Sequence, residues 1–169
     1  MPALPGFCQW LERTAVGAAM RNSAWMAPAV ETVHIYAIIA LLTSNAILGL
    51  RLLGWAFRGE PVSKLSKQLL PWAWSAFALL AATGLLLFSS EATKYYVNGV
   101  FRLKMLMILL AGTNAIVFHF TVYKRLAIWD EARVPPLGAR LAACFSIVLW
   151  IGVIAAGRWI AYFLPVYYY

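Results

Sequence analysis

Four long apolar segments dominate this chain and restrict it to a membrane fold. They cover residues 28–55, 69–89, 101–123 and 139–163. A hydrocarbon core about 30 Å thick requires about 20 mostly apolar residues per helix, and each segment meets that length. Only 12% of the residues are charged, against roughly 25% in an average soluble domain. We therefore expect an all-α integral membrane protein, a four-helix bundle in contact with membrane lipid.

The parts outside these segments are short. We divide the chain into an outer-surface amphipathic segment (residues 1–27), the transmembrane domain (28–163) and an aromatic tail (164–169). Apolar and small residues recur at helical spacing near the start, at Phe7, Trp10, Leu11, Thr14 and Ala18. This pattern predicts one interfacial helix over residues 5–20. We expect no signal peptide, because the first 25 residues contain no continuous apolar run.

The net charge of +8 has a topological explanation. The basic residues gather after the first and third segments, at Arg51, Arg58, Lys64 and Lys67 and at Lys124, Arg125, Arg133 and Arg140. An excess of Lys and Arg marks cytoplasmic loops, so we expect both termini outside the cytoplasm and interpret Arg51 as a topology charge. There is no basic helix or basic patch with interleaved aromatic residues, so we expect no nucleic-acid binding.

The two histidines, His34 and His119, both lie inside apolar segments. An ionisable side chain is costly there, and imidazole is a common metal and haem ligand. Successive spans alternate in direction, so the two residues fall on opposite sides of the midplane, about 20 Å apart by helix rise. The two histidines of one protomer therefore cannot ligate the same iron.

Helix rise brings a different set of residues to the depth of His34. Glu31 lies one turn before it, Lys104 begins the third span, Arg158 ends the fourth, and Arg102 lies just beyond. These residues form a candidate cofactor-binding cluster, with His34 and Lys104 as candidate metal ligands. The alternative is that the charged side chains reach the membrane surface as snorkelling flanks, which suits Arg102 best.

The inner half offers a possible second site made of His119, Asn114 and Asn45. The alternative is structural: asparagines inside membranes often hydrogen-bond between helices, and His119 can be an ordinary polar packing residue.

Several motifs resemble an uncharacterised family of small four-helix bacterial inner-membrane proteins, and they span nearly the whole chain. They are Glu31-x-x-His34, Pro71-Trp72-x-Trp74, Phe101-Arg102-x-Lys104, Asn114-x-x-x-Phe118-His119 and Gly157-Arg158-Trp159-Ile160. The resemblance implies a multi-pass protein of the bacterial inner membrane, whose termini would then be periplasmic. It implies no particular activity.

A more distant similarity connects the chain to the membrane-bound protoporphyrinogen oxidase and copper-resistance D families. It consists of His34 early in the first span, Arg51 at its end, Gly84 in the second and Lys104 at the start of the third. The oxidase family binds haem b and relies on a histidine and a lysine that match His34 and Lys104. The chain lacks that family's Arg-x-x-Asn-Glu-x-Pro stretch and has Glu-Ala-Arg-Val-Pro-Pro at 131–136. This departure counts against protoporphyrinogen oxidation but leaves haem binding open.

The sequence thus predicts a haem b protein that passes electrons. His34 would be an axial ligand, and Lys104 either the second ligand or a partner of a haem propionate. Arg158 and Arg102 would pair with propionates, since guanidinium groups match carboxylates. Glu31 would orient the His34 ring.

Several alternatives stay open at this stage. The electron partner would be a quinone or a redox protein, and the chain would act alone, as a homo-oligomer or as a subunit of a larger complex. A haem-free transporter or proton- or metal-handling protein could use the same Glu31, His34 and Lys104 cluster. A structural subunit is the third alternative. The sequence does not decide whether the protein is an enzyme.

Overall fold

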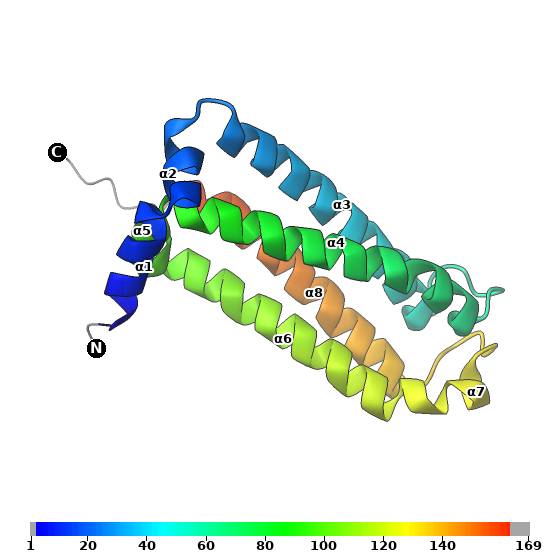
Figure 1. Ribbon diagram of the computed structural model, residues 1–169. Helices are drawn as coiled ribbons and strands as arrows, with labels where there is room; N and C mark the ends of the chain where they lie inside the picture. The colour runs from blue at the N-terminus through cyan, green and yellow to red at the C-terminus, as the bar shows by residue number, and fades with distance from the viewer. Residues whose placement is uncertain (1–2, 163–169) are drawn as a thin grey trace.

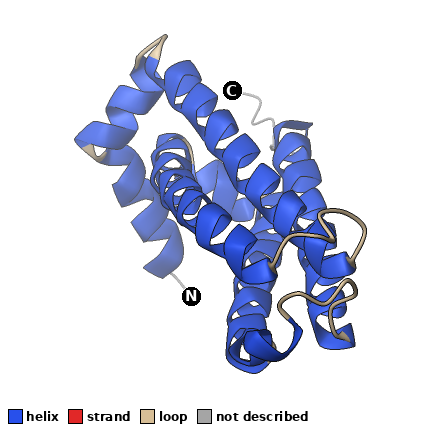
Figure 2. Ribbon diagram, turned by 90° about the vertical axis from the view of Figure 1, so that its right-hand side faces the viewer, coloured by secondary structure: helices blue, strands red, loops and turns tan. Residues whose placement is uncertain are grey.

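The computed structural model of the protein describes residues 3–162, and within this range it contains helices and no strand (Figure 2). Four helices are long and apolar enough to cross a membrane: α3 (Met26–Leu53), α4 (Val62–Ser90), α6 (Gly99–Thr121) and α8 (Leu137–Trp159). They run alongside one another (Figure 1). The predicted all-α, multi-pass fold is thereby confirmed. The aromatic tail at 164–169 lies outside the described residues.

The four helices form an open arrangement. Helix α3 packs against α4 and α8, and α6 packs against α8, whereas α4 and α6 are not among the pairs that pack extensively. The order across the bundle is therefore α4, α3, α8, α6. Only 6% of the most apolar stretch of α6 and 11% of that of α4 are buried, against 22% for α3 and 28% for α8. Helices α4 and α6, at the two edges of this arrangement, thus present most of their apolar surface to lipid.

The spans begin and end at residues that suit those positions. Gly54 follows α3 with φ of 72°, and its N–H closes the last turn of that helix, which favours glycine because L residues rarely adopt this conformation. Asn98 precedes α6, and its Oδ1 accepts hydrogen bonds from Val100 N and Phe101 N at 2.9 and 3.1 Å. Helix α4 begins before the predicted 69–89 range, because its first two turns carry lysines that resemble a loop in the sequence.

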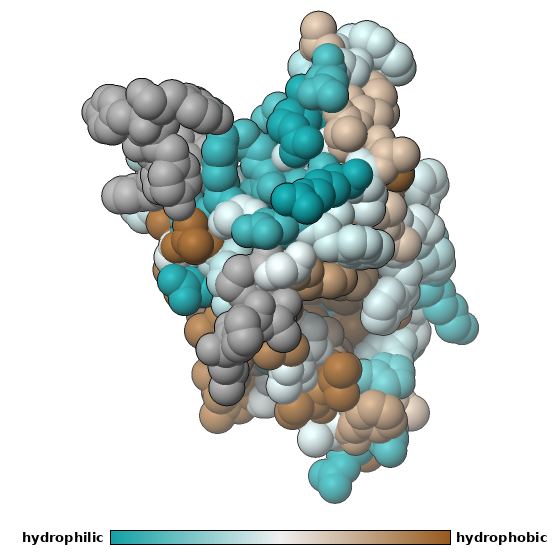
Figure 3. All heavy atoms as spheres, turned by 60° about the vertical axis from the view of Figure 1, so that its left-hand side comes forward, coloured by the Kyte–Doolittle hydropathy of each residue, from teal (hydrophilic) through white to brown (hydrophobic). Residues whose placement is uncertain are grey.

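Three short helices gather at one end of the bundle, with the end of α8 (Figure 1). They are α1 (Ala3–Arg13), α2 (Ala15–Asn22) and α5 (Ala92–Val97), and we call them the collar. We take the collar to lie on the predicted outer side. The space-filling view toward this end shows hydrophilic residues beside apolar ones, a mixture suited to an interface (Figure 3).

The single helix predicted over residues 5–20 is wrong, because the chain breaks at Thr14. The Thr14 hydroxyl accepts a hydrogen bond from Gly17 N at 3.2 Å and begins α2 as its N-cap. A Cβ on Gly17 would lie 2.7 Å from Leu11 O and 2.8 Å from Ser89 O. The break therefore lets α2 lie directly against the end of α4, where only glycine fits.

The opposite end of the bundle holds the loops between α3 and α4 and between α6 and α8. The second loop contains η1 (Tyr123–Arg125) and α7 (Leu126–Trp129). A buried cluster of Leu52, Val62, Ala139 and Ala143 joins the spans here. We refer to this as the inner end, following the predicted topology.

Candidate functional site

His34 lies in the collar-side half of α3 and is held by Thr83 of α4. Its Nδ1 atom is 2.7 Å from Thr83 Oγ1, and the same hydroxyl donates to Leu79 O at 2.7 Å. A threonine hydroxyl has one proton, and when that proton is donated to Leu79 O, Oγ1 accepts from His34 Nδ1–H. The neutral imidazole then carries its free lone pair on Nε2. This is the tautomer that a histidine needs to bind a metal through Nε2.

Lys104 enters the same half of the bundle from α6. It is half-buried, and its ammonium makes no hydrogen bond or ion pair with any residue in the range 3–162. It lies near enough to His34 for their charges to interact. The structure therefore brings the two predicted ligands into one region, with Lys104 Nζ and His34 Nε2 unused for bonding within the described chain.

Two glycines lie beside these side chains. A Cβ on Gly84 would lie 3.5 Å from His34 Cε1, and one on Gly157 would lie 3.6 Å from Lys104 Nζ. Both distances are those of ordinary van der Waals contact, so the imidazole faces α4 at Gly84 and the ammonium faces α8 at Gly157, with space for a methyl group in between. The Gly84 noted in the sequence thus belongs to this site, and Gly157 is an addition to it.

The other predicted members of the outer cluster lie at its margin. Glu31, Arg102 and Arg158 are exposed, and in the described range no hydrogen bond or ion pair joins them to His34 or Lys104. The Arg158 guanidinium lies 5.7 Å from the ring centre of Tyr162, a cation–π contact. Burial of the Tyr95 ring, followed by the charges of Glu91 and Glu31, raises the pKa of Tyr95, which places Glu31 near α5.

Within residues 3–162, no hydrogen bond or ring contact joins the three residues of the predicted second site, His119, Asn114 and Asn45, to one another. His119 is exposed and stacks on Tyr123, with 5.4 Å between ring centres. Asn114 Nδ2 donates to Ala142 O of α8 at 2.9 Å, so this residue links two helices as the structural alternative expects. Asn45 Nδ2 donates within its own helix, to Leu41 O at 3.1 Å. His119 follows Lys104 by a helix rise of roughly 22 Å, so the two histidines remain far apart.

The described residues include no group of three or more His, Cys, Asp or Glu placed to hold a metal ion.

Sequence reasoning missed the role of Arg51 at the inner end. The residue is fully buried, so it has a structural role in addition to the topological one that the sequence predicts. Its Nε donates to Glu60 O at 2.7 Å, and Nη2 donates to Asp130 O and Ala132 O at 3.3 and 3.1 Å. Arg51 therefore fastens both inner loops to the end of α3. The sequence signal that could have shown this is its place one turn before a helix-ending glycine, which turns the next loop back over it.

Asp130 completes this inner arrangement, which we call the clasp. Its carboxylate accepts from Ser63 N and Ser63 Oγ at 2.7 and 2.6 Å and so caps the start of α4. Burial alone would raise the pKa of Asp130. The hydrogen bonds from Ser63 and Val62 and the charge of Arg51 outweigh that effect and lower it. The carboxylate of Asp130 therefore has a structural role.

Comparison with known families places the chain in one of them. The model of a family of unknown function (DUF6644) matches residues 7–163. The chain belongs to this family. No curated protein and no solved structure matches the chain. The match confirms the resemblance to an uncharacterised family, and it covers the collar from Phe7 onward, all four spans and both residues of the His34–Lys104 pair. Similarity to the oxidase and copper-resistance families stays a prediction.

Proposed function

We propose that this protein binds haem b in the collar-side half of its bundle and passes electrons through it. The observation that carries the proposal is the hydrogen bond from His34 Nδ1 to Thr83 Oγ1, which leaves Nε2 free inside a membrane-spanning helix. Ligating histidines commonly donate their other ring N–H to a fixed acceptor, which sets the ring orientation and tautomer. His34 is the proposed axial ligand.

Lys104 supplies the second polar group of the proposed site. An ammonium without an anionic partner is costly in an apolar span, and a haem provides one in its propionates. In this arrangement Lys104 either binds a propionate or acts as the second axial ligand. His34 and Lys104 share one region, and each side chain has a glycine beside it. We consider this arrangement more consistent with haem binding than with a role in apolar packing.

Exposed charged residues at the margin of the site are also suited to a haem. Arg102 and Arg158 are cations on the collar side of Lys104 and His34. Guanidinium groups recognise carboxylates with two parallel hydrogen bonds, so both are suited to propionates. Glu31 is proposed to tune the site by its charge, because Thr83 already takes the orienting role that the sequence predicted for it.

The haem is proposed to lie on the side of the bundle between α4 and α6. Helices α4 and α6 do not pack extensively on each other, although each carries one side of the candidate site, Thr83 on α4 and Lys104 on α6. When bound, haem supplies one-electron chemistry at its iron. The chain's own contribution is to orient His34, place positive charge near the propionates and exclude water.

We propose a bacterial inner membrane as the location, with both termini periplasmic and the clasp cytoplasmic. The electron partner is proposed to be a membrane quinone or a redox protein, with the chain acting as a homo-oligomer or as a subunit of a larger complex. The short loops support this, since there is little extramembrane chain to carry out further chemistry.

An absorption spectrum of protein purified from haem-replete cells tests the proposal. We expect a Soret band and α-bands that sharpen on reduction. His34→Ala should remove most of the haem, whereas the matched change His119→Ala should retain it, because His119 lies at the other end of α6. A blank wild-type spectrum would contradict the proposal, and so would equal loss of haem in both variants.

The haem-free alternative has one observation in its favour. Lys104 and His34 are ionisable groups that interact inside the membrane, which is also the arrangement of a proton- or ion-handling site. A blank spectrum combined with proton or metal flux that depends on Lys104 would favour this function.

A further inference from the structure

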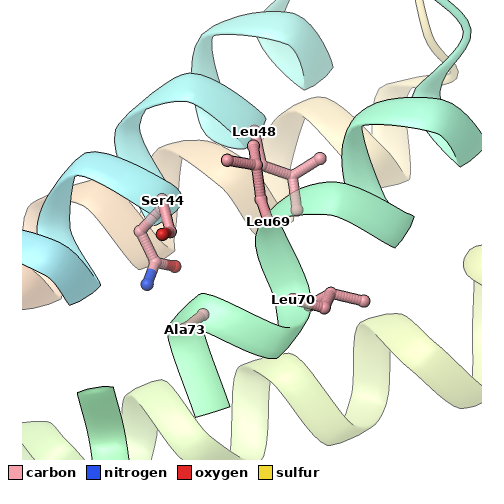
Figure 4. Close-up of a pocket in the computed structure, with 6 residues that line it drawn as sticks. Ser44, Leu48, Leu69, Leu70 and Ala73 are labelled. Carbon is pink, nitrogen blue, oxygen red and sulfur yellow. The ribbon is translucent and has the colours of Figure 1, made fainter. Parts of the chain in front are cut away.

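A notch open to the membrane lies between α3 and α4, on the inner side of the His34 site. Its residues come from two helices, Ser44, Asn45 and Leu48 from α3 and Leu69, Leu70 and Ala73 from α4 (Figure 4). The notch has about 200 Å³ of free space, which includes its open side. This space is large enough for a water molecule or a carbonyl oxygen.

The amide of Asn45 is only partly used by the fold. One N–H of Nδ2 donates to Leu41 O at 3.1 Å, while the second N–H and Oδ1 have no hydrogen-bond partner within residues 3–162. An amide left without partners in hydrocarbon costs several kcal/mol on transfer scales. The notch therefore holds one free donor and one free acceptor among otherwise apolar side chains.

Pro71 adds to the polar character of this region. Proline has no N–H, so the carbonyl of Lys67 loses the donor that an ordinary helix would give it. Such freed carbonyls in membrane helices are satisfied by neighbouring side chains, water or local adjustment. The interruption in the backbone hydrogen bonding of α4 at Pro71 lies among the α4 residues that line the notch, Leu69, Leu70 and Ala73.

We propose that the notch binds the head ring of a membrane quinone. One ring carbonyl would enter the notch and accept from the free N–H of Asn45, while the ring would lie against Leu48 and Leu69. The reduced form carries hydroxyl groups, which can donate to Asn45 Oδ1 instead, so one amide serves both forms. This inference rests on the proposed electron-carrying function, for which the quinone would be the partner.

The depth of the notch favours a quinone over a phospholipid carbonyl. Asn45 lies eight residues before the end of α3 at Leu53, which is roughly 12 Å by helix rise. Ester carbonyls belong to the interface, whereas a quinone ring dissolves in the hydrocarbon region. The open lipid-facing side of the notch gives such a molecule direct entry.

Fluorescence quenching tests this site without reading the haem. The full-length protein is placed in nanodiscs of quinone-free ester phospholipid and titrated with a short-chain benzoquinone, which quenches the exposed indoles of Trp72 and Trp74 beside the notch. We expect saturable quenching that is at least about tenfold weaker in Asn45→Leu, the effect of losing one or two hydrogen bonds. Pro71→Ala, which restores the helix donor, should also weaken binding.

The matched control is Thr113→Val, which removes a lipid-facing polar group of α6 that bonds only to Leu109 O of its own helix. It should leave the affinity unchanged. Quenching without saturation, as expected if the notch holds only water or a lipid ester, would overturn the inference. Equal affinity in wild type and Asn45→Leu would do the same.

The two proposals fail separately. A haem spectrum without saturable quinone binding rejects the notch as a quinone site and leaves the haem proposal standing. Saturable binding that depends on Asn45 in a protein with no Soret band supports the notch and rejects the haem proposal.

Discussion

The two ends of the bundle each place a cation inside the membrane protein, but they treat it differently. At the clasp, Arg51 is fully buried and gives hydrogen bonds to Glu60 O, Asp130 O and Ala132 O, so that Nη1 is its one buried atom without a partner in the described range. In the outer half, Lys104 is half-buried and makes no such bond within residues 3–162. The clasp uses its polar groups to hold loops, whereas the outer site leaves them free.

This difference separates structural polar groups from candidate functional ones. Removing a donor that satisfies buried carbonyls should destabilise the fold, because those carbonyls are left without partners. Removing a charge that has no partner in the fold should lower the free energy of unfolding little or even raise it, as is common at binding sites. The two ends should therefore respond to apolar substitution with opposite signs.

The largest effect is expected at the clasp. Arg51→Met would leave three loop carbonyls without their donor, and the free energy of unfolding should fall by about 3–5 kcal/mol. Thermal unfolding in detergent measures the change, with Arg140→Met as the matched control on an exposed inner-end arginine. Equal, small losses in both variants would show that Arg51 does not hold the two loops in place.

Asp130 should give a smaller and pH-dependent effect. Its pKa is lowered in the folded state, so its stabilising contribution is complete above the unfolded pKa of about 3.9 and is lost as the pH falls through the lower folded pKa. Asp130→Asn should lower stability by about 1–2 kcal/mol at neutral pH and remove this acid dependence. Unfolding followed from pH 7 to pH 3 tests it, with exposed Glu131→Gln as control. A variant that keeps the full wild-type acid dependence would show that other groups cause it.

Thr83 should matter more for haem than for stability. Thr83→Val keeps the shape but removes the acceptor of His34 Nδ1–H, so stability should change by about 1 kcal/mol or less. The affinity for haem should fall about tenfold or more, as for other groups that orient metal ligands. Haem titration measures this, and Thr113→Val is the control. Unchanged affinity for haem would mean that Thr83 does not fix the orientation of the His34 imidazole.

Lys104 should have the smallest effect on stability, and in the opposite direction to Arg51. Lys104→Met removes an ammonium that finds no partner in the described chain, so the haem-free protein should be stabilised by about 1 kcal/mol or less. Haem binding should weaken in the same variant. A clear loss of stability without haem would show that Lys104 serves the fold as Arg51 does, and the contrast between the two ends would fail.

Much of the fold could be predicted from the sequence, because span length and apolarity are local properties. Helix rise alone brought His34 and Lys104 to one depth and kept His119 away from both. The break at Thr14 could not be foreseen, since it depends on the close approach of Gly17 to the backbone of α4. The burial of Arg51 depends on how two loops distant in sequence fold over it. The tautomer of His34 depends on Thr83, forty-nine residues away.

Chemical rescue of the proposed axial ligand tests the central claim most directly. His34→Gly removes the imidazole but leaves Lys104, Thr83 and the surrounding space, and the purified variant is titrated with haem with and without added imidazole. We predict weak haem binding alone and recovery of the wild-type Soret band when imidazole occupies the vacated position. Tight haem binding by His34→Gly without imidazole, or no recovery with it, would contradict the assignment of His34 as the ligand.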